Sequence, residues 1–279
     1  MRFDPTADYS KLDQPEVLGV IFHPCRDSGG PSPVGALDHD IAVENGISLG
    51  ARFYLAVAEA PHILFFHGNG ETIGDYDEIG PMYNAVGLNF LAVDYRGYGR
   101  SSGTPTVSNM LADAHLVLAE VRQWMAAAGR PGPLLVMGRS LGCACALELA
   151  AAHEADLAGL IIESGFSETL PLLCNLGIDV ERLDITEEDG FRNVGKIERI
   201  NLPTLLLHAQ NDQLIPVYSA ALLQAQCGAR TKELQIVPGA GHNDIIARTG
   251  RMYFEVIRGF VQKVCKTAAP PRRRYRSAR

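Results

Sequence analysis

Residues 132 to 142 read Gly-Pro-Leu-Leu-Val-Met-Gly-Arg-Ser-Leu-Gly, and a stretch rich in Ala, Leu and Cys follows at once. The apolar run Leu134 to Met137 predicts a short buried strand, and Leu141 to Ala152 predicts a helix. A sharp turn from strand to helix holds a serine hydroxyl out of the backbone, and its crowding favours glycine two residues before and two residues after the serine. The stretch therefore predicts Ser140 as a nucleophile, although the bare Gly-x-Ser-x-Gly pattern also arises by chance in a Gly-rich chain.

A serine nucleophile needs a histidine to take its proton and a carboxylate to hold that histidine in the right tautomer. Asp212 is the first carboxylate after the apolar run 204–208, and His242 lies in a Gly-rich loop after another short predicted strand, 233–237. Each of the three residues thus follows its own predicted strand, in the order Ser, Asp, His. The predicted catalytic triad is Ser140, Asp212 and His242.

Alternatives exist for the acid and the base. Glu163 ends the predicted strand 160–162 and is a rival for the acid, while Asp212 on its own is also typical of a tight turn. Asp244 is too close in sequence to His242 to orient its imidazole. His208 lies inside a predicted strand, which favours a structural role.

The developing oxyanion needs hydrogen-bond donors aimed at it. The main-chain N–H of Leu141 follows the nucleophile directly, and the main-chain N–H of Asn69 lies in the loop after the predicted strand 63–66. We predict these two groups as the oxyanion hole. The alternative is a dinucleotide phosphate loop at Gly68-Asn69-Gly70 with Asp94 as a ribose ligand, but the third small residue of that fingerprint is replaced by Ile73.

Strand and helix signals alternate through most of the chain, which predicts the α/β class with a mostly parallel central sheet and helices on both faces. The stretch 41–54 is predicted as one strand or as two halves of a hairpin around Asn45-Gly46. The other predicted strands are 17–22, 63–66, 90–94, 134–137, 160–162, 204–208 and 233–237, and the predicted helices are 75–85, 108–128, 141–152 and 248–263.

The length of 279 residues and the hydrophobic content of 47% predict a single domain over residues 1–269. Between about residues 164 and 201 the alternating pattern stops, and we expect this insertion to form a small lid over the strand ends. Leu172, Leu173 and Leu176 in the lid either touch an acyl chain or pack the lid itself.

The formal net charge is −7, yet five arginines lie in the basic segment 270–279, leaving 20 basic against 32 acidic residues in the rest of the chain. The basic segment is expected to be a disordered tail, or a contact for an acidic membrane or partner surface. An acidic body argues against nucleic acid as a partner, because phosphate binding needs a basic face.

The six cysteines form no Cys-x-x-Cys pair and no metal-ligand spacing with histidine, so no metal site is predicted and free thiols in a reducing cytosol are expected. No run reaches membrane-spanning length and no apolar leader opens the chain, which predicts a soluble, cytoplasmic protein. The sequence makes no prediction of oligomeric state.

Together these motifs make about residues 40 to 265 resemble the α/β-hydrolase superfamily, and within it the small-lid serine hydrolases that include protein depalmitoylases and relatives of prolyl peptidases. The resemblance implies the α/β-hydrolase fold, the triad Ser140, Asp212 and His242, and oxyanion donors at Asn69 and Leu141. The membrane-acting depalmitoylases carry a lipidated N-terminal cysteine cluster, whereas the first cysteine here stands alone, so no stable membrane anchor is expected. The motifs that carry the resemblance are 67–70, 94–101, 138–142, 163–166 and 211–212.

The chemistry expected from these residues is acyl transfer through an acyl-enzyme, with no metal and no organic cofactor. Small-molecule carboxylesters or thioesters of small to medium acyl groups are the first substrate class, and peptides or amides the second. A non-catalytic binding module on the same fold is a third possibility. A dehalogenase is disfavoured because that group carries Asp at the position of Ser140.

Overall fold

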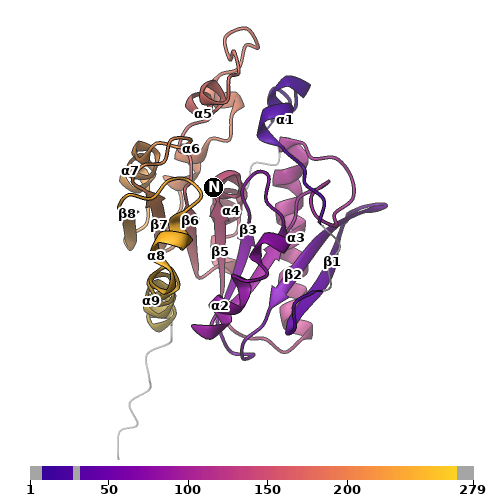
Figure 1. The fold of residues 1–279 in the computed structure, drawn as a ribbon, viewed down its shortest axis with the longest axis vertical. Helices are drawn as coiled ribbons and strands as arrows, with labels where there is room; N and C mark the ends of the chain where they lie inside the picture. Colours follow the sequence, from indigo (N-terminus) through magenta and orange to yellow (C-terminus); the bar gives the residue numbers. More distant parts are fainter. Residues whose placement is uncertain (1–7, 28–31, 269–279) are drawn as a thin grey trace, which may run out of the picture.

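One eight-stranded sheet runs through the part of the chain that the computed structural model describes, residues 8–27 and 32–268 (Figure 1). Its spatial order is β1-β2-β4-β3-β5-β6-β7-β8. β1 pairs with β2 and β2 with β4 in antiparallel fashion, and all other neighbours are parallel. The strands are β1 (Ala36–Glu44), β2 (Ile47–Tyr54), β3 (His62–Phe66), β4 (Asn89–Val93), β5 (Leu134–Arg139), β6 (Gly159–Glu163), β7 (Thr204–Ala209) and β8 (Lys232–Val237).

The mostly parallel sheet predicted from the sequence is thus confirmed, and the stretch 41–54 belongs to a hairpin. Asn45-Gly46 provides its tight turn, with Gly46 at φ 78°, a backbone conformation that glycine adopts without steric cost. All residues of β3, β4, β5, β6 and β7 are buried, as expected for parallel strands covered on both faces.

Helices cover both faces of the sheet and form two separate cores. The first core joins the sheet to α1, α3, α4, α5, α6 and α7, and the second joins its opposite face to α2, α8 and α9 (Figure 1). The α-helices are α1 (Pro15–Ile21), α2 (Gly80–Ala85), α3 (Val107–Ala127), α4 (Cys143–Ala152), α5 (Thr169–Asn175), α6 (Asn193–Ile197), α7 (Val217–Gln226), α8 (Ile245–Thr249) and α9 (Arg251–Ala268).

The prediction of a strand at 17–22 is wrong, because this segment forms α1. Its apolar, β-branched run favoured a strand, but Pro15 sits at the first helical turn, where its missing N–H costs nothing. Val17 and Ile21, four residues apart, are the buried side chains and lie on one face of the helix.

The predicted helix 75–85 is divided into a short 3-10 helix, η1 (Ile73–Tyr76), and α2. Pro81 explains the division, since it stands in the first turn of α2 and lacks the N–H that would continue a helix from the preceding residues.

The parallel strands set the place of the candidate site. β5, β7 and β8 run in the same direction, so their carboxyl ends reach the same edge of the sheet. Ligands bind at this edge in open α/β sheets. The predicted basic tail 270–279 lies outside the described residues.

Candidate active site

The turn after β5 presents Ser140 in a strained conformation. Ser140 has φ 50°, in the left-handed region, and opens the single 3-10 turn η2 (Ser140–Gly142) that leads into α4. A Cβ atom at Gly138 would lie 2.3 Å from the carbonyl oxygen of Gly142, and a Cβ at Gly142 would lie 2.1 Å from that of Phe66. Both neighbours are backbone, so only glycine fits at either position, as the crowding argument predicted.

The three residues predicted as a triad lie together. Nε2 of His242 is 3.0 Å from Oγ of Ser140, and Nδ1 of His242 is 2.7 Å from Oδ2 of Asp212. Asp212 and Ser140 are buried, and the imidazole is mostly buried between them. These distances allow a proton to pass from the hydroxyl to the imidazole.

The loop after β7 holds the Asp212 carboxylate in one orientation. Oδ1 of Asp212 accepts hydrogen bonds from the main-chain N–H groups of Leu214 at 3.0 Å and Ile215 at 2.8 Å, which leaves Oδ2 for His242. Burial alone would raise the pKa of Asp212, but the hydrogen bonds from His242 and Ile215 outweigh it and lower the pKa. Asp212 is therefore ionised at neutral pH.

His208 supports the same loop from inside β7. Its Nε2 lies 2.8 Å from the carbonyl oxygen of Ile215 and 3.6 Å from Oδ2 of Asp212. Burial lowers the pKa of His208, which keeps the ring neutral. Its contacts fit the structural role expected from the sequence.

The two rival carboxylates are engaged elsewhere. Oε2 of Glu163 accepts the hydroxyl of Tyr253, and Oε1 lies 3.3 Å from Nε of Arg139. Asp244 accepts the main-chain N–H of Gly241 at 2.6 Å and is paired with Arg248 at 2.7 Å. Asp212 is hydrogen-bonded to the imidazole of His242, whereas neither Glu163 nor Asp244 is.

The predicted oxyanion donors belong to two loops: Leu141 lies in the turn η2 directly after Ser140, and Asn69 lies in the loop after β3. Among the described residues, neither the main-chain N–H of Leu141 nor that of Asn69 has a protein acceptor. The side chain of Asn69 is fixed: its Oδ1 accepts the main-chain N–H of His23 and the hydroxyl of Tyr98, both at 2.7 Å. No local pattern in the sequence marks His23 or Tyr98 as a residue that holds Asn69.

The loop of residues 67–71, called here the oxyanion loop after the predicted donor Asn69, begins with a buried histidine that is paired with an aspartate. Nε2 of His67 is 3.1 Å from Oδ1 of Asp94, and both side chains are completely buried. Burial alone would lower the pKa of His67, but the Asp94 carboxylate raises it. Oδ1 of Asp94 also accepts the main-chain N–H of Ile73 at 2.8 Å, and the complete burial of the side chain argues against its role as a ribose ligand in the dinucleotide alternative.

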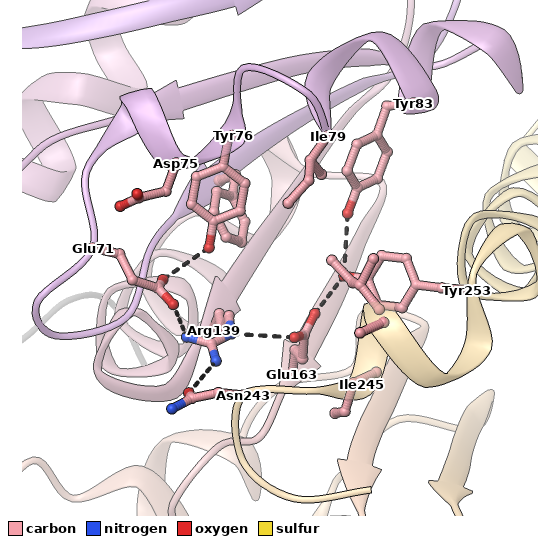
Figure 2. Close-up of a pocket in the computed structure, with 13 residues that line it drawn as sticks. Glu71, Asp75, Tyr76, Ile79, Tyr83, Arg139, Glu163, Asn243, Ile245 and Tyr253 are labelled. Carbon is pink, nitrogen blue, oxygen red and sulfur yellow. Dashed lines mark hydrogen bonds and ion pairs between the residues drawn. The ribbon is translucent and has the colours of Figure 1, made fainter.

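A charged cluster that the sequence did not predict lies next to Ser140, on the face of the sheet that α2, α8 and α9 cover. Arg139 points into it from the end of β5 and meets Glu71 and Glu163, and the hydroxyls of Tyr76 and Tyr253 complete it (Figure 2). The cluster borders a cavity of about 330 Å³. The pairing of Arg139 with Glu163 in strand register was the available signal, since both end neighbouring parallel strands.

The segment 164–201 carries α5 and α6 and touches the N-terminal part of the chain. Nζ of Lys11 lies 3.1 Å from Asp184 and 3.2 Å from Asp189. A cavity of about 230 Å³ lies between this segment and the loop after β7. Leu172 lines that cavity, whereas Leu173 is buried in the first core.

No group of three or more His, Cys, Asp and Glu side chains in residues 8–27 and 32–268 could hold a metal ion. Within the same residues, every helix is too short or too polar to span a bilayer.

Comparison with known proteins places the chain in a superfamily. The family model for serine aminopeptidase, S33, matches residues 59–173. Human alpha/beta hydrolase domain-containing protein 17B is 31% identical over 206 residues, which cover 72% of this chain and 66% of that protein. The protein bem46 of Schizosaccharomyces pombe is 29% identical over 209 residues, which cover 72% of this chain and 67% of that protein. The chain belongs to the α/β-hydrolase superfamily.

Solved structures share the α/β-hydrolase fold. The esterase Pf2001 of Pyrococcus furiosus has a TM-score of 0.71 at 17% identity, covering 86% of this chain and 98% of that one. A soluble variant of monoglyceride lipase from Saccharomyces cerevisiae, in complex with a substrate analogue, has a TM-score of 0.66 at 16% identity, covering 85% of this chain and 96% of that one. The superfamily supports a hydrolase, and the solved structures show its fold.

Proposed function

We propose that this chain is a serine hydrolase that cleaves carboxylester or thioester bonds through an acyl-enzyme at Ser140. The observation that carries the proposal is the line of contacts from Ser140 through His242 to Asp212, at 3.0 and 2.7 Å. Hydroxyl, imidazole and carboxylate at these distances form the arrangement that activates a serine.

In the proposed reaction, Oγ of Ser140 attacks the carbonyl carbon of the substrate while Nε2 of His242 takes the hydroxyl proton. The ionised Asp212 stabilises the imidazolium, and the N–H groups of Asn69 and Leu141 stabilise the oxyanion. His242 then gives the proton to the alcohol or thiol, which departs, and the acyl group remains bound to Oγ of Ser140. Water attacks the acyl-enzyme while His242 takes a proton from it, and His242 returns this proton to Oγ of Ser140 as the carboxylic acid leaves. Neither a metal nor an organic cofactor takes part.

The cavity of about 230 Å³ beside the loop after β7 favours a small to medium acyl group. It is lined by apolar side chains that include Phe166, Leu172 and Ile215, at the edge of the sheet to which Ser140 belongs. We further propose that residues 1–269 form a single domain and that residues 164–201 within it form a lid over the active site. All six cysteines are free thiols, which favours the cytoplasm as the compartment of this protein.

Peptide or amide hydrolysis is the second candidate, and the match to the serine aminopeptidase model over residues 59–173 favours it. Amides and esters pass through the same tetrahedral intermediate, so the triad by itself serves both. The walls of the substrate pocket decide between them.

Labelling with a fluorophosphonate probe tests the proposal. The native protein is expected to label and Ser140→Ala is expected not to, with the circular dichroism of both unchanged. A native protein that does not label would favour a non-catalytic binding module. Nitrophenyl esters and acyl thioesters of increasing chain length, with aminoacyl amides beside them, then separate the two substrate classes.

A further inference from the structure

Arg139 occupies the middle position between the two loops that flank Ser140. On one side its Nη1 is paired with Glu71, in the oxyanion loop. On the other side its Nη2 donates to the main-chain carbonyl of His242 at 3.1 Å and to Oδ1 of Asn243 at 2.7 Å. Figure 2 shows the guanidinium between Glu71, Glu163 and Asn243. Its side chain is only 10% exposed.

We propose that Arg139 is a positioning residue that ties the oxyanion loop to the loop of residues 238–244, called here the histidine loop. This inference rests on the proposed function, because the two loops carry Asn69 and His242. Arg139 touches neither the hydroxyl of Ser140 nor the imidazole. It acts through the backbone that holds them.

The connection to the oxyanion loop passes through Glu71. Oε2 of Glu71 accepts the main-chain N–H of Gly68 at 2.7 Å and the hydroxyl of Tyr76 at 2.8 Å, while Oε1 takes Arg139. Gly68 immediately precedes Asn69, so this carboxylate sets the backbone from which the proposed oxyanion donor projects. The connection to the histidine loop is direct, through the carbonyl of His242 itself.

The chemistry of arginine suits this position. A guanidinium offers five N–H donors in a rigid plane, whereas a lysine ammonium is a single point charge. Burial alone would lower the pKa of Arg139, but the carboxylates of Glu71 and Glu163 raise it, so the group is charged. Without this cation two carboxylates would remain buried side by side, and they would repel each other and separate the elements that carry them.

The cavity of about 330 Å³ beside this cluster provides a way to test the role chemically. Arg139, Glu71, Glu163 and Asn243 all contribute to its wall, and the cavity is partly open to solvent. Truncation of Arg139 to alanine would extend the cavity to the place where the guanidinium lay. A guanidinium ion from solution could then fill that place.

The experiment compares Arg139→Ala and Arg139→Lys with Arg52→Ala as the matched control. Arg52 is also buried and also bridges two carboxylates, Asp38 at 2.7 Å and Asp77 at 2.8 Å, but it lies on β2, three strands from β5. Ester turnover and the rate of fluorophosphonate labelling are measured for each, per folded molecule.

Arg139→Ala is expected to lower kcat by about 100-fold with little change in KM, the effect of a displacement of about 1 Å at the reacting groups. Arg139→Lys is expected to retain part of the lost activity, since it keeps the charge. Guanidinium at millimolar concentration, far below the molar range that unfolds proteins, is expected to raise kcat of Arg139→Ala alone. Arg52→Ala is expected to lose stability and to keep its kcat.

The outcomes separate the two proposals. If the native protein labels at Ser140 and both Arg139 variants keep the kcat of Arg52→Ala, the positioning role is overturned and the proposed function stands. If the native protein neither labels nor turns over any ester, thioester or amide, the proposed function is overturned and this inference with it. Should Arg139→Ala fail to fold, Arg139→Lys decides: a tenfold or larger loss of kcat supports the role, and an unchanged kcat overturns it.

Discussion

Replacing Asp212 by Asn changes one atom and is expected to disable the imidazole without moving it. The two main-chain N–H groups of Leu214 and Ile215 require an oxygen at the position of Oδ1. The amide NH₂ of the variant must therefore occupy the position of Oδ2, which lies 2.7 Å from Nδ1 of His242 in the native protein. An NH₂ group there donates, so Nδ1 has to accept.

A neutral imidazole that accepts at Nδ1 carries its proton on Nε2, and Nε2 faces Ser140 at 3.0 Å. In this tautomer it cannot take the hydroxyl proton. Loss of the right tautomer together with the negative charge costs about 10⁴-fold in kcat for such triads, or about 5.5 kcal/mol of activation free energy. Asp212→Asn is expected to fall in that range and to keep the native fold.

The assay is the steady-state hydrolysis of a nitrophenyl ester, with the rate of fluorophosphonate labelling as a second readout. Glu163→Gln is the matched control, because Glu163 is also a buried carboxylate at a strand end but is bound to Arg139 and Tyr253. We expect its kcat to stay within tenfold of the native value. The reasoning is refuted if Asp212→Asn retains activity within tenfold while Glu163→Gln abolishes it.

Two further predictions concern stability. In Gly142→Ala the new Cβ would lie 2.1 Å from the carbonyl oxygen of Phe66, so we expect the free energy of unfolding in urea to fall by about 3 kcal/mol or more. Gly195→Ala is the control, because a Cβ there has no neighbour within 4 Å, and it should be neutral or stabilising. Equal stability of the two variants would contradict the steric explanation of Gly142. Burial alone would raise the pKa of Glu148, but His115 and Lys196 lower it from 4.5 to about 2. This carboxylate therefore stabilises the fold above pH 4.5, and the contribution is lost as the pH falls toward 2. Glu148→Gln should be less stable than the native protein by up to about 3 kcal/mol near neutral pH, with a gap that narrows in acid; a gap independent of pH would count against it.

The elements that could be predicted were those with strong local signals. The glycines around Ser140 and the apolar strands 134–137 and 204–208 follow directly from steric and burial rules, and the structure contains them. The segment 17–22 could not be assigned in the same way. A short apolar run suits a strand as well as a helix until its packing partners are known.

The contacts around the site were less accessible from the sequence. Asn69 and Leu141 are predicted as oxyanion donors because each follows a strand, but the residues that hold Asn69 in place come from distant parts of the chain. His23 lies 46 positions before it and Tyr98 lies 29 after it. Such contacts depend on how loops fold over the sheet, and the local sequence pattern does not predict them.

The contacts of His23 with Asn69 connect the segment ahead of the sheet to the proposed oxyanion donor. The main-chain N–H of His23 donates to Oδ1 of Asn69 at 2.7 Å. Nδ1 of the His23 ring lies 2.8 Å from Nδ2 of the same Asn69 side chain. A fragment cut to begin at β1 would keep every strand and all three residues of the proposed triad. It would nevertheless lose the contacts of His23 with the proposed oxyanion loop, together with the buried side chains of α1 in the first core, so such trimming is expected to lower both turnover and stability.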